Sequence, residues 1–87
     1  MRLSINRGER KMTHSLAEKI ETIWNSKKSG TFGAFYGAGK GRAIIMIDGR
    51  KFDVSVTHFG YDVLDEATSF VGSGSTVFSA AYLAINP

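Results

Sequence analysis

The sequence feature that most constrains the fold is a glycine-rich stretch at residues 29–49, where aromatic residues alternate with glycines before the apolar run of residues 43–47. Such alternation, followed by a turn and an apolar run, predicts a β-hairpin. Asp48 and Gly49 give a second turn signal, because both positions tolerate positive φ in a two-residue loop. We therefore predict three antiparallel strands, at residues 31–37, 42–47 and 50–58.

The lengths of the two loops predict which side chains share a face of this sheet. A two-residue second loop places Ile45 opposite Phe52, and a four-residue loop at residues 38–41 places Phe35 opposite Ile44. Directly opposed residues share a face. The core face then carries Phe32, Ala34, Tyr36, Ala43, Ile45, Ile47, Phe52, Val54 and Val56.

The second predicted face has an apolar centre, formed by Phe35, Ile44 and Met46, with charged residues at its flanks. A middle strand that is apolar on both faces is typical of a sheet covered on both sides, so the C-terminal segment or a second helix can lie over it. Left uncovered, the same side chains form an interaction surface or a homodimer contact, because monomers rarely expose a contiguous apolar patch. The sequence leaves both alternatives open.

A helix is predicted before the hairpin. Ser15 and Glu18 fit a capping box, in which each side chain bonds the backbone near the other. Apolar residues recur at helical spacing: Leu16, Ala17, Ile20, Ile23 and Trp24. The helix should end near residues 27–28, with Gly30 as its left-handed stop, and its apolar side should cover the core face of the sheet.

The remaining segments complete an α+β fold in a single domain of residues 1–87. Asp62 can cap a second, short helix through Phe70, and residues 72–75 read as a connector. Residues 76–85 fit a strand or a helix, and their β-branched and aromatic start favours a fourth, C-terminal strand narrowly. Residues 1–12 begin with the alternation of an edge strand, although a basic arm has a similar pattern.

Composition limits the class of protein. The chain has 87 residues and no cysteine, so we expect one core without disulfides, in a reducing, cytoplasmic setting. No segment approaches the ~20 apolar residues that span a bilayer, and the N-terminus lacks a secretion signal, so no membrane contact is expected. No metal or cofactor site is expected either.

The charges are uneven along the chain. All 11 Lys and Arg residues lie at or before Lys51, where the formal charge is +7, and the remainder carries −4. This asymmetry favours an acidic partner or nucleic acid, although the two halves can also neutralise each other. The hairpin topology predicts one cluster of Lys27, Lys28, Arg50 and Lys51, and another of Lys40, Arg42 and His58.

Two motifs suggest chemistry without establishing it. Residues 37–41 resemble a phosphate loop, but the residue after Lys40 is Gly41 rather than Ser or Thr, and a strand follows instead of a helix. The favoured interpretation is a hairpin turn that can carry Lys40 to a phosphate. The two histidines, His14 and His58, could act on RNA as general acid and base, but nothing in the sequence brings them together. We therefore expect no enzymatic activity.

The order helix, three strands, helix resembles the double-stranded-RNA-binding domain in outline. That family carries a lysine cluster at the start of its second helix, where this chain has Asp62, Asp65 and Glu66. These acidic side chains would repel RNA. The resemblance therefore does not favour the family's function.

The favoured hypothesis is a small non-enzymatic binding protein that occupies a surface on a protein or ribonucleoprotein partner. This is the general form of compact phage and mobile-element inhibitors of nucleic-acid-handling host complexes, such as anti-CRISPR proteins. The residues expected to bind the partner are Phe35, Lys40, Arg42, Ile44, Met46 and Lys51, with Lys27, Lys28 and Arg50 as contacts to phosphates or acidic groups. A direct nucleic-acid-binding domain is the alternative, and a small ribonuclease is the third hypothesis.

Overall fold

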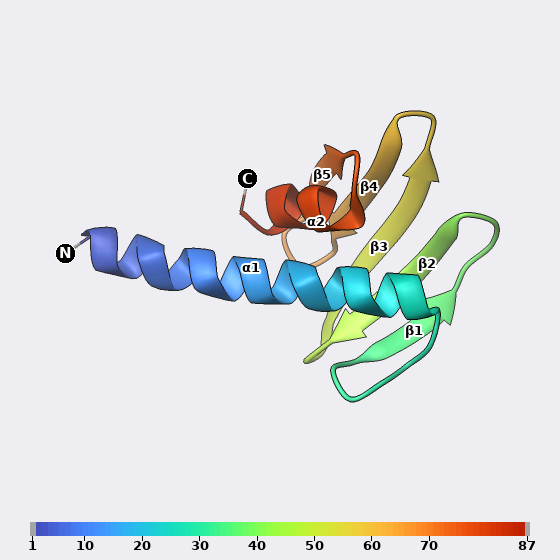
Figure 1. Cartoon of the computed structure of the whole chain (residues 1–87), viewed down its shortest axis with the longest axis horizontal. Coiled ribbons are helices and arrows are strands. Elements are labelled where there is room, and N and C mark those ends of the chain that lie inside the picture. Colours follow the sequence, from blue (N-terminus) through green and yellow to red (C-terminus); the bar gives the residue numbers. More distant parts are fainter. Residues whose placement is uncertain (1, 87) are drawn as a thin grey trace.

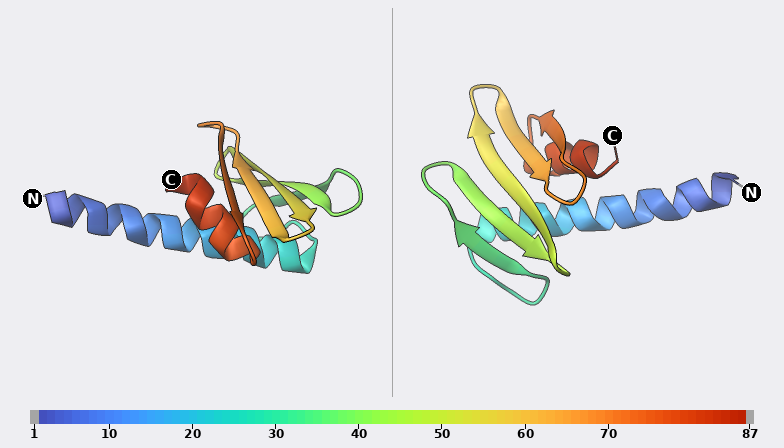
Figure 2. Two further views of the ribbon diagram at one scale, coloured as in Figure 1. Left: turned by 90° about the horizontal axis from the view of Figure 1, so that it is seen from above. Right: turned by 180° about the vertical axis from the view of Figure 1, so that it is seen from behind.

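The computed structural model describes the backbone of residues 2–86 and the side chains of residues 12–86. Its elements are α1 (Arg2–Ser26), β1 (Ala34–Gly37), β2 (Arg42–Ile47), β3 (Arg50–Thr57), β4 (Gly60–Asp65), β5 (Phe70–Gly74) and α2 (Val77–Ile85). The strands form one antiparallel sheet in chain order. Both helices lie on the same side of it (Figures 1 and 2). The predicted α+β class is confirmed.

The first helix, α1, starts earlier than the sequence predicts. It begins at Arg2, so the predicted edge strand at residues 1–12 is wrong where it is described, and Met1 lies outside the described residues. The charged residues in this segment are good helix formers, and its single glycine does not stop the helix. Ser15 therefore lies inside α1 instead of capping it. Within residues 2–86, neither helix combines the length and apolar character that crossing a bilayer requires.

The C-terminal end of α1 lies close to its predicted position. The helix ends at Ser26, and the following residue, Lys27, adopts the left-handed conformation with φ 57°. The amide of Lys27 still donates to the carbonyl of Ile23, at 2.9 Å. Lys27, and not Gly30, is therefore the left-handed stop.

The turn between β2 and β3 follows the prediction. Asp48 and Gly49 both have positive φ, 51° and 80°, as a two-residue hairpin loop requires. Ile47 lies opposite Arg50, and Ile45 lies opposite Phe52. The predicted register of these two strands is confirmed.

The turn between β1 and β2 is one residue shorter than predicted. The amide of Ala38 donates to the carbonyl of Arg42, at 3.0 Å, which leaves Gly39, Lys40 and Gly41 as the loop. Gly39 and Gly41 both have positive φ, and a loop of this length with glycine in the left-handed region is a common hairpin. Because a slip of one residue turns a strand over, every side chain of β1 lies on the face opposite to the predicted one.

The predicted second helix is a β-hairpin. Residues 60–65 and 70–74 form β4 and β5, and Asp62 lies opposite Ser73 on the neighbouring strand. The Asp62 carboxylate accepts a hydrogen bond of 2.6 Å from the Ser73 hydroxyl, so it caps no helix. The apolar side chains of residues 63–71 recur at a spacing typical of a helix. Pairing of β4 with β3 stabilises a strand there instead.

The C-terminal segment is a helix, and the narrowly preferred strand is wrong. Thr76 caps α2 through a capping box with Ser79. The carboxylate of Glu21 on α1 accepts the amide of Phe78, at 3.2 Å, which ties the two helices together. A negative group is favourable at this position, because the N-terminal end of a helix carries partial positive charge.

The core lies between the helices and the sheet. It consists of Ala17, Ile20, Ile23, Trp24, Ala43, Ile45, Ile47, Phe52, Val54, Val63, Val77, Ala80, Ala81 and Ala84. The predicted helix face and most predicted core positions of β2 and β3 are therefore buried. Four predicted core residues are not: Phe32, Tyr36 and Val56 are exposed, and Ala34 lies opposite Met46 on the other face.

Candidate functional site

One face of the sheet carries no helix from residues 2–86. The right-hand view of Figure 2, from behind, shows the strands in front of α1, and α1 and α2 contribute their buried residues to the side of Ile45 and Phe52. We call the other side the open face. Its side chains are Ala34, Tyr36, Arg42, Ile44, Met46, Lys51, Asp53, Ser55, Thr57, Asp62, Leu64, Val71 and Ser73.

A mostly apolar row crosses the open face from edge to edge. Its members are neighbours in register: Tyr36, Ile44, Asp53, Leu64 and Val71. Tyr36 is 54% exposed and Val71 is 59% exposed at the two ends of the row, while Ile44 and Leu64 are half-buried. Met46, also half-buried, lies next to Ile44 along β2. This row is thus an apolar strip across the open face with one carboxylate, Asp53, at its centre.

The central carboxylate is neutralised on the same face. Asp53 accepts two hydrogen bonds from Arg42, at 3.0 Å from Nε and 2.6 Å from Nη2. The Asp53 side chain is only 12% exposed, whereas that of Arg42 is half exposed. The hydrogen bond to Asp53, with its negative charge, raises the pKa of Arg42 above its ordinary value. The remaining N–H groups of Arg42 can donate to a partner from the middle of the apolar row.

Phe35 does not lie on the open face, contrary to the prediction. It lies opposite Ile45 and packs against the core. The register shift in β1 puts Tyr36 beside Ile44 instead. Tyr36 therefore replaces Phe35 as the aromatic residue of the open face.

Three further predicted residues lie on the open face, and two others do not. Arg42 and Met46 lie on it, and Lys51 is exposed on it. Lys40 is exposed in the β1–β2 loop. Arg50, next to Lys51 in the chain, points to the helix side, because alternate residues of a strand point to opposite faces.

The predicted cluster of Lys27, Lys28, Arg50 and Lys51 does not form. The ammonium of Lys27 lies 3.1 Å from the centroid of the Trp24 ring, and Trp24 packs against Tyr61. Tyr61 lies opposite Val56, at the other end of β3 from residues 50–51. Burial lowers the pKa of Lys27 from its ordinary value. The second predicted cluster does gather at one end of the sheet: Lys40, Arg42 and His58 lie in two neighbouring turns and at the start of β2.

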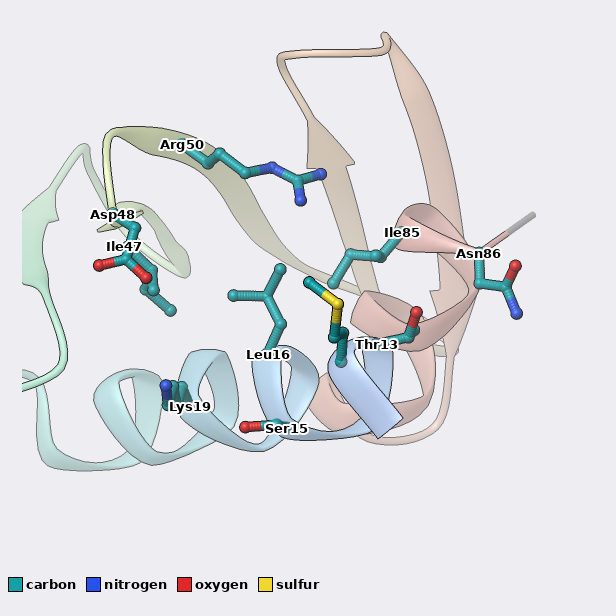
Figure 3. Close-up of a pocket in the computed structure, with 10 residues that line it drawn as sticks. Thr13, Ser15, Leu16, Lys19, Ile47, Asp48, Arg50, Ile85 and Asn86 are labelled. Atoms are coloured by element: carbon teal, nitrogen blue, oxygen red, sulfur yellow. The ribbon is translucent and has the colours of Figure 1, made fainter. Parts of the chain in front are cut away.

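A cavity of about 640 Å³ opens on the helix side, between α1, the β2–β3 turn and the end of α2 (Figure 3). Leu16, Ile47 and Ile85 line it with apolar groups. Arg50 reaches over it and donates from Nη2 to the fully buried carboxylate of Asp65, at 2.5 Å. Because Asp65 already neutralises Arg50, the cavity offers an apolar space without a free cation from that residue.

Groups that could catalyse a reaction are dispersed. The His14 ring packs edge-on against Phe78, at 5.0 Å between centroids, and His58 lies in the exposed β3–β4 turn. Lys40 lies on a different turn. Among the described residues, no group of three or more His, Asp or Glu side chains could hold a metal ion.

Sequence reasoning missed three residues of the apolar row that crosses the open face: Tyr36, Leu64 and Val71. Tyr61 and Val63 lie on either side of Asp62, a strand-like alternation that would have put Leu64 on the same face as Asp62. Comparison with protein-family models, curated proteins and solved structures found no match for this chain. The open face is therefore the feature of the molecule that bears on its function.

Proposed function

We propose that the protein is a small, non-enzymatic binding module whose open face seats on a partly apolar surface of a protein partner. One observation carries this proposal: both helices cover the same side of the sheet, and Tyr36 and Val71 stay exposed on the other. Contiguous apolar side chains that a small domain leaves exposed mark interaction surfaces.

The polar groups of the open face suit recognition of an acidic or carbonyl-rich surface. Arg42 reaches from the start of β2 to the central Asp53, which holds its guanidinium, so little side-chain freedom is lost when it binds. Tyrosine and arginine are also the residue types that most often dominate binding energy at interfaces. The exposed Lys51 adds a cation at the end of β3 next to the β2–β3 turn, beside Met46.

Direct nucleic-acid binding through this face is the less favoured alternative. Arg42 and Lys51 are balanced there by Asp53 and Asp62, so the face has no surplus of positive charge to replace counterions on phosphates. A titration with generic DNA and RNA over a range of salt concentrations checks this. Tight binding that weakens steeply with salt would favour the nucleic-acid hypothesis over a protein partner.

The finer hypotheses stay predictions. A phage or mobile-element inhibitor of the anti-CRISPR kind is one way for such a module to act, and a cytoplasmic setting is the corresponding location. A ribonuclease requires His14 or His58. Loss of a measured RNA-cleaving activity on changing either residue would support that third hypothesis.

The proposal is tested by capturing the partner from the source cells with tagged variants. Tyr36→Asp and Met46→Asp place a charge on the open face, whereas Phe59→Asp and Met12→Asp place the same charge on exposed apolar residues elsewhere. We expect the first two variants to recover at least about tenfold less partner than the unaltered chain, and the two controls to match it. Equal recovery by all four variants would contradict the proposal.

A further inference from the structure

The two edges of the sheet differ in how their backbone groups are satisfied. At the β1 edge, the loop of residues 27–33 runs along the outside of the strand (Figure 1). The Ser29 hydroxyl accepts the amide of Phe35, at 3.0 Å, and the amide of Gly30 donates to the carbonyl of Gly33, at 2.9 Å. The chain itself thus protects this edge. Unprotected strand edges are templates for pairing with another chain.

The hydrogen bonds at one end of β4 show which of its amides and carbonyls point toward β3 and which point toward β5. The amide of Glu66 donates to the carbonyl of Lys51, so the residue before it, Asp65, directs its backbone groups to the other side, toward β5. The amide of Ser69 donates to the carbonyl of Asp65, at 2.8 Å, in agreement. Every second residue of β4, counted back from Asp65, therefore bonds β5.

The β5 residues that lie opposite these β4 residues direct their own amides and carbonyls toward β4. Phe70, Gly72 and Gly74 lie opposite Asp65 and the alternate residues of β4, so their amides and carbonyls point inward. The intervening residues, Val71 and Ser73, point theirs outward. Among the described residues outside β4, no backbone hydrogen bond reaches Val71 or Ser73, and β5 has neither a proline nor a charged residue to block pairing.

Exposed apolar side chains flank the β5 edge on both faces of the sheet. Val71 is exposed on the open face, and Phe70 is exposed on the helix side. Leu83 of α2 is also exposed there; its Cβ would lie 2.9 Å from a Cβ built on Gly72, which puts Leu83 directly over β5. An added strand would therefore bury apolar surface as well as pairing backbone groups.

We infer that this edge pairs with the same edge of a second copy of the chain. In a two-fold interface the same patch of surface meets its own copy, so a patch that carries charges of one sign repels itself. Residues 67–87, which include β5 and α2, contain no Asp, Glu, Lys or Arg. Antiparallel pairing centred on Gly72 brings Val71 of each copy opposite Ser73 of the other, where their outward groups exchange hydrogen bonds. The inference does not depend on the proposed function.

The first test is analytical ultracentrifugation of the unaltered chain and two variants, from about 1 µM to about 1 mM. Ser73→Pro removes an outward amide together with the hydroxyl that bonds Asp62 on β4, whereas Ser73→Ala removes only that hydroxyl and keeps the amide. We expect a concentration-dependent dimer, weakened about 30-fold or more by Ser73→Pro and unchanged by Ser73→Ala. A monomer throughout, or equal dimerisation of Ser73→Pro, would overturn the inference.

The second test uses the unaltered chain, so it decides the matter even if Ser73→Pro does not fold. Amide hydrogen exchange is followed residue by residue at low and high protein concentration. We expect the amides of Val71 and Ser73 to become protected as concentration rises, while those of Phe70 and Gly72 are protected throughout. Rates for Val71 and Ser73 that do not depend on concentration would overturn the proposed pairing.

Discussion

The two helices cover one face of the sheet, whereas neither of them covers the other face. On the helix side, Ile45 and Phe52 are fully buried against α1 and α2. On the open face, the residues next to Ile45, namely Ile44 and Met46, are only half-buried, and Tyr36 is exposed. The apolar run in β2 therefore serves two purposes. One half builds the core, and the other half is available for a partner.

The largest expected effect is the loss of a core side chain on the helix side. Phe52→Ala should lower the free energy of unfolding by about 4 kcal/mol, because the buried ring leaves a cavity among packed neighbours. Urea denaturation measures it. Leu64→Ala, on the half-buried open face, is the matched comparison, and an equal loss there would erase the difference between the faces.

The buried ion pair gives the next largest effect. Arg50→Ala should cost about 3 kcal/mol, since it leaves the fully buried Asp65 carboxylate without its partner. Lys51→Ala, one residue along and on the open face, should change stability by less than about 0.5 kcal/mol. Comparable losses in the two variants would show that Arg50 contributes nothing beyond an exposed charge.

Close packing of α2 on β5 sharpens the comparison further. A Cβ at Gly72 would overlap the carbonyl oxygen of Ala80 and the amide nitrogen of Ala84, so Gly72→Ala should cost about 2 kcal/mol. At Gly30 a Cβ meets nothing within 4 Å, and Gly30→Ala should be close to neutral. Thermal denaturation of both variants tests the pair. Equal melting temperatures would mean that α2 is not closely packed against β5.

A substitution at the exposed end of the open face should affect stability less than any of the three losses above. Tyr36→Asp should lower the free energy of unfolding by less than about 1 kcal/mol, because its side chain is half exposed and gains little from folding. The same substitution should abolish partner recovery. A variant that unfolds instead would place Tyr36 among the residues that hold the fold.

The hairpin shows what the sequence could predict and what it could not. Asp48 and Gly49 admit one short loop, so the β2–β3 register and the faces of Ile44 and Met46 followed correctly. The β1–β2 turn holds several glycines, which allow loops of different length, and one residue of slip exchanged Phe35 for Tyr36. Local pattern alone could not choose between the two loops.

The second half of the chain depends on contacts that sequence spacing does not reveal. Residues 62–71 carry a helical spacing of apolar side chains, yet they form strands, because β4 pairs with β3 along its whole length. Asp65 also bonds Arg50, fifteen residues away. Long-range pairing of this kind outweighed the local signal, and it brought Leu64 and Val71 to the candidate site.

The most direct test of the open face is a titration of the methyl-labelled protein with the captured partner, followed by NMR. The methyl groups of Ile44, Met46 and Leu64 should shift or broaden, because they lie on the open face. Those of Leu16 and Ile85, which line the cavity on the helix side, should stay unchanged. Changes confined to Leu16 and Ile85 would contradict the proposed binding surface.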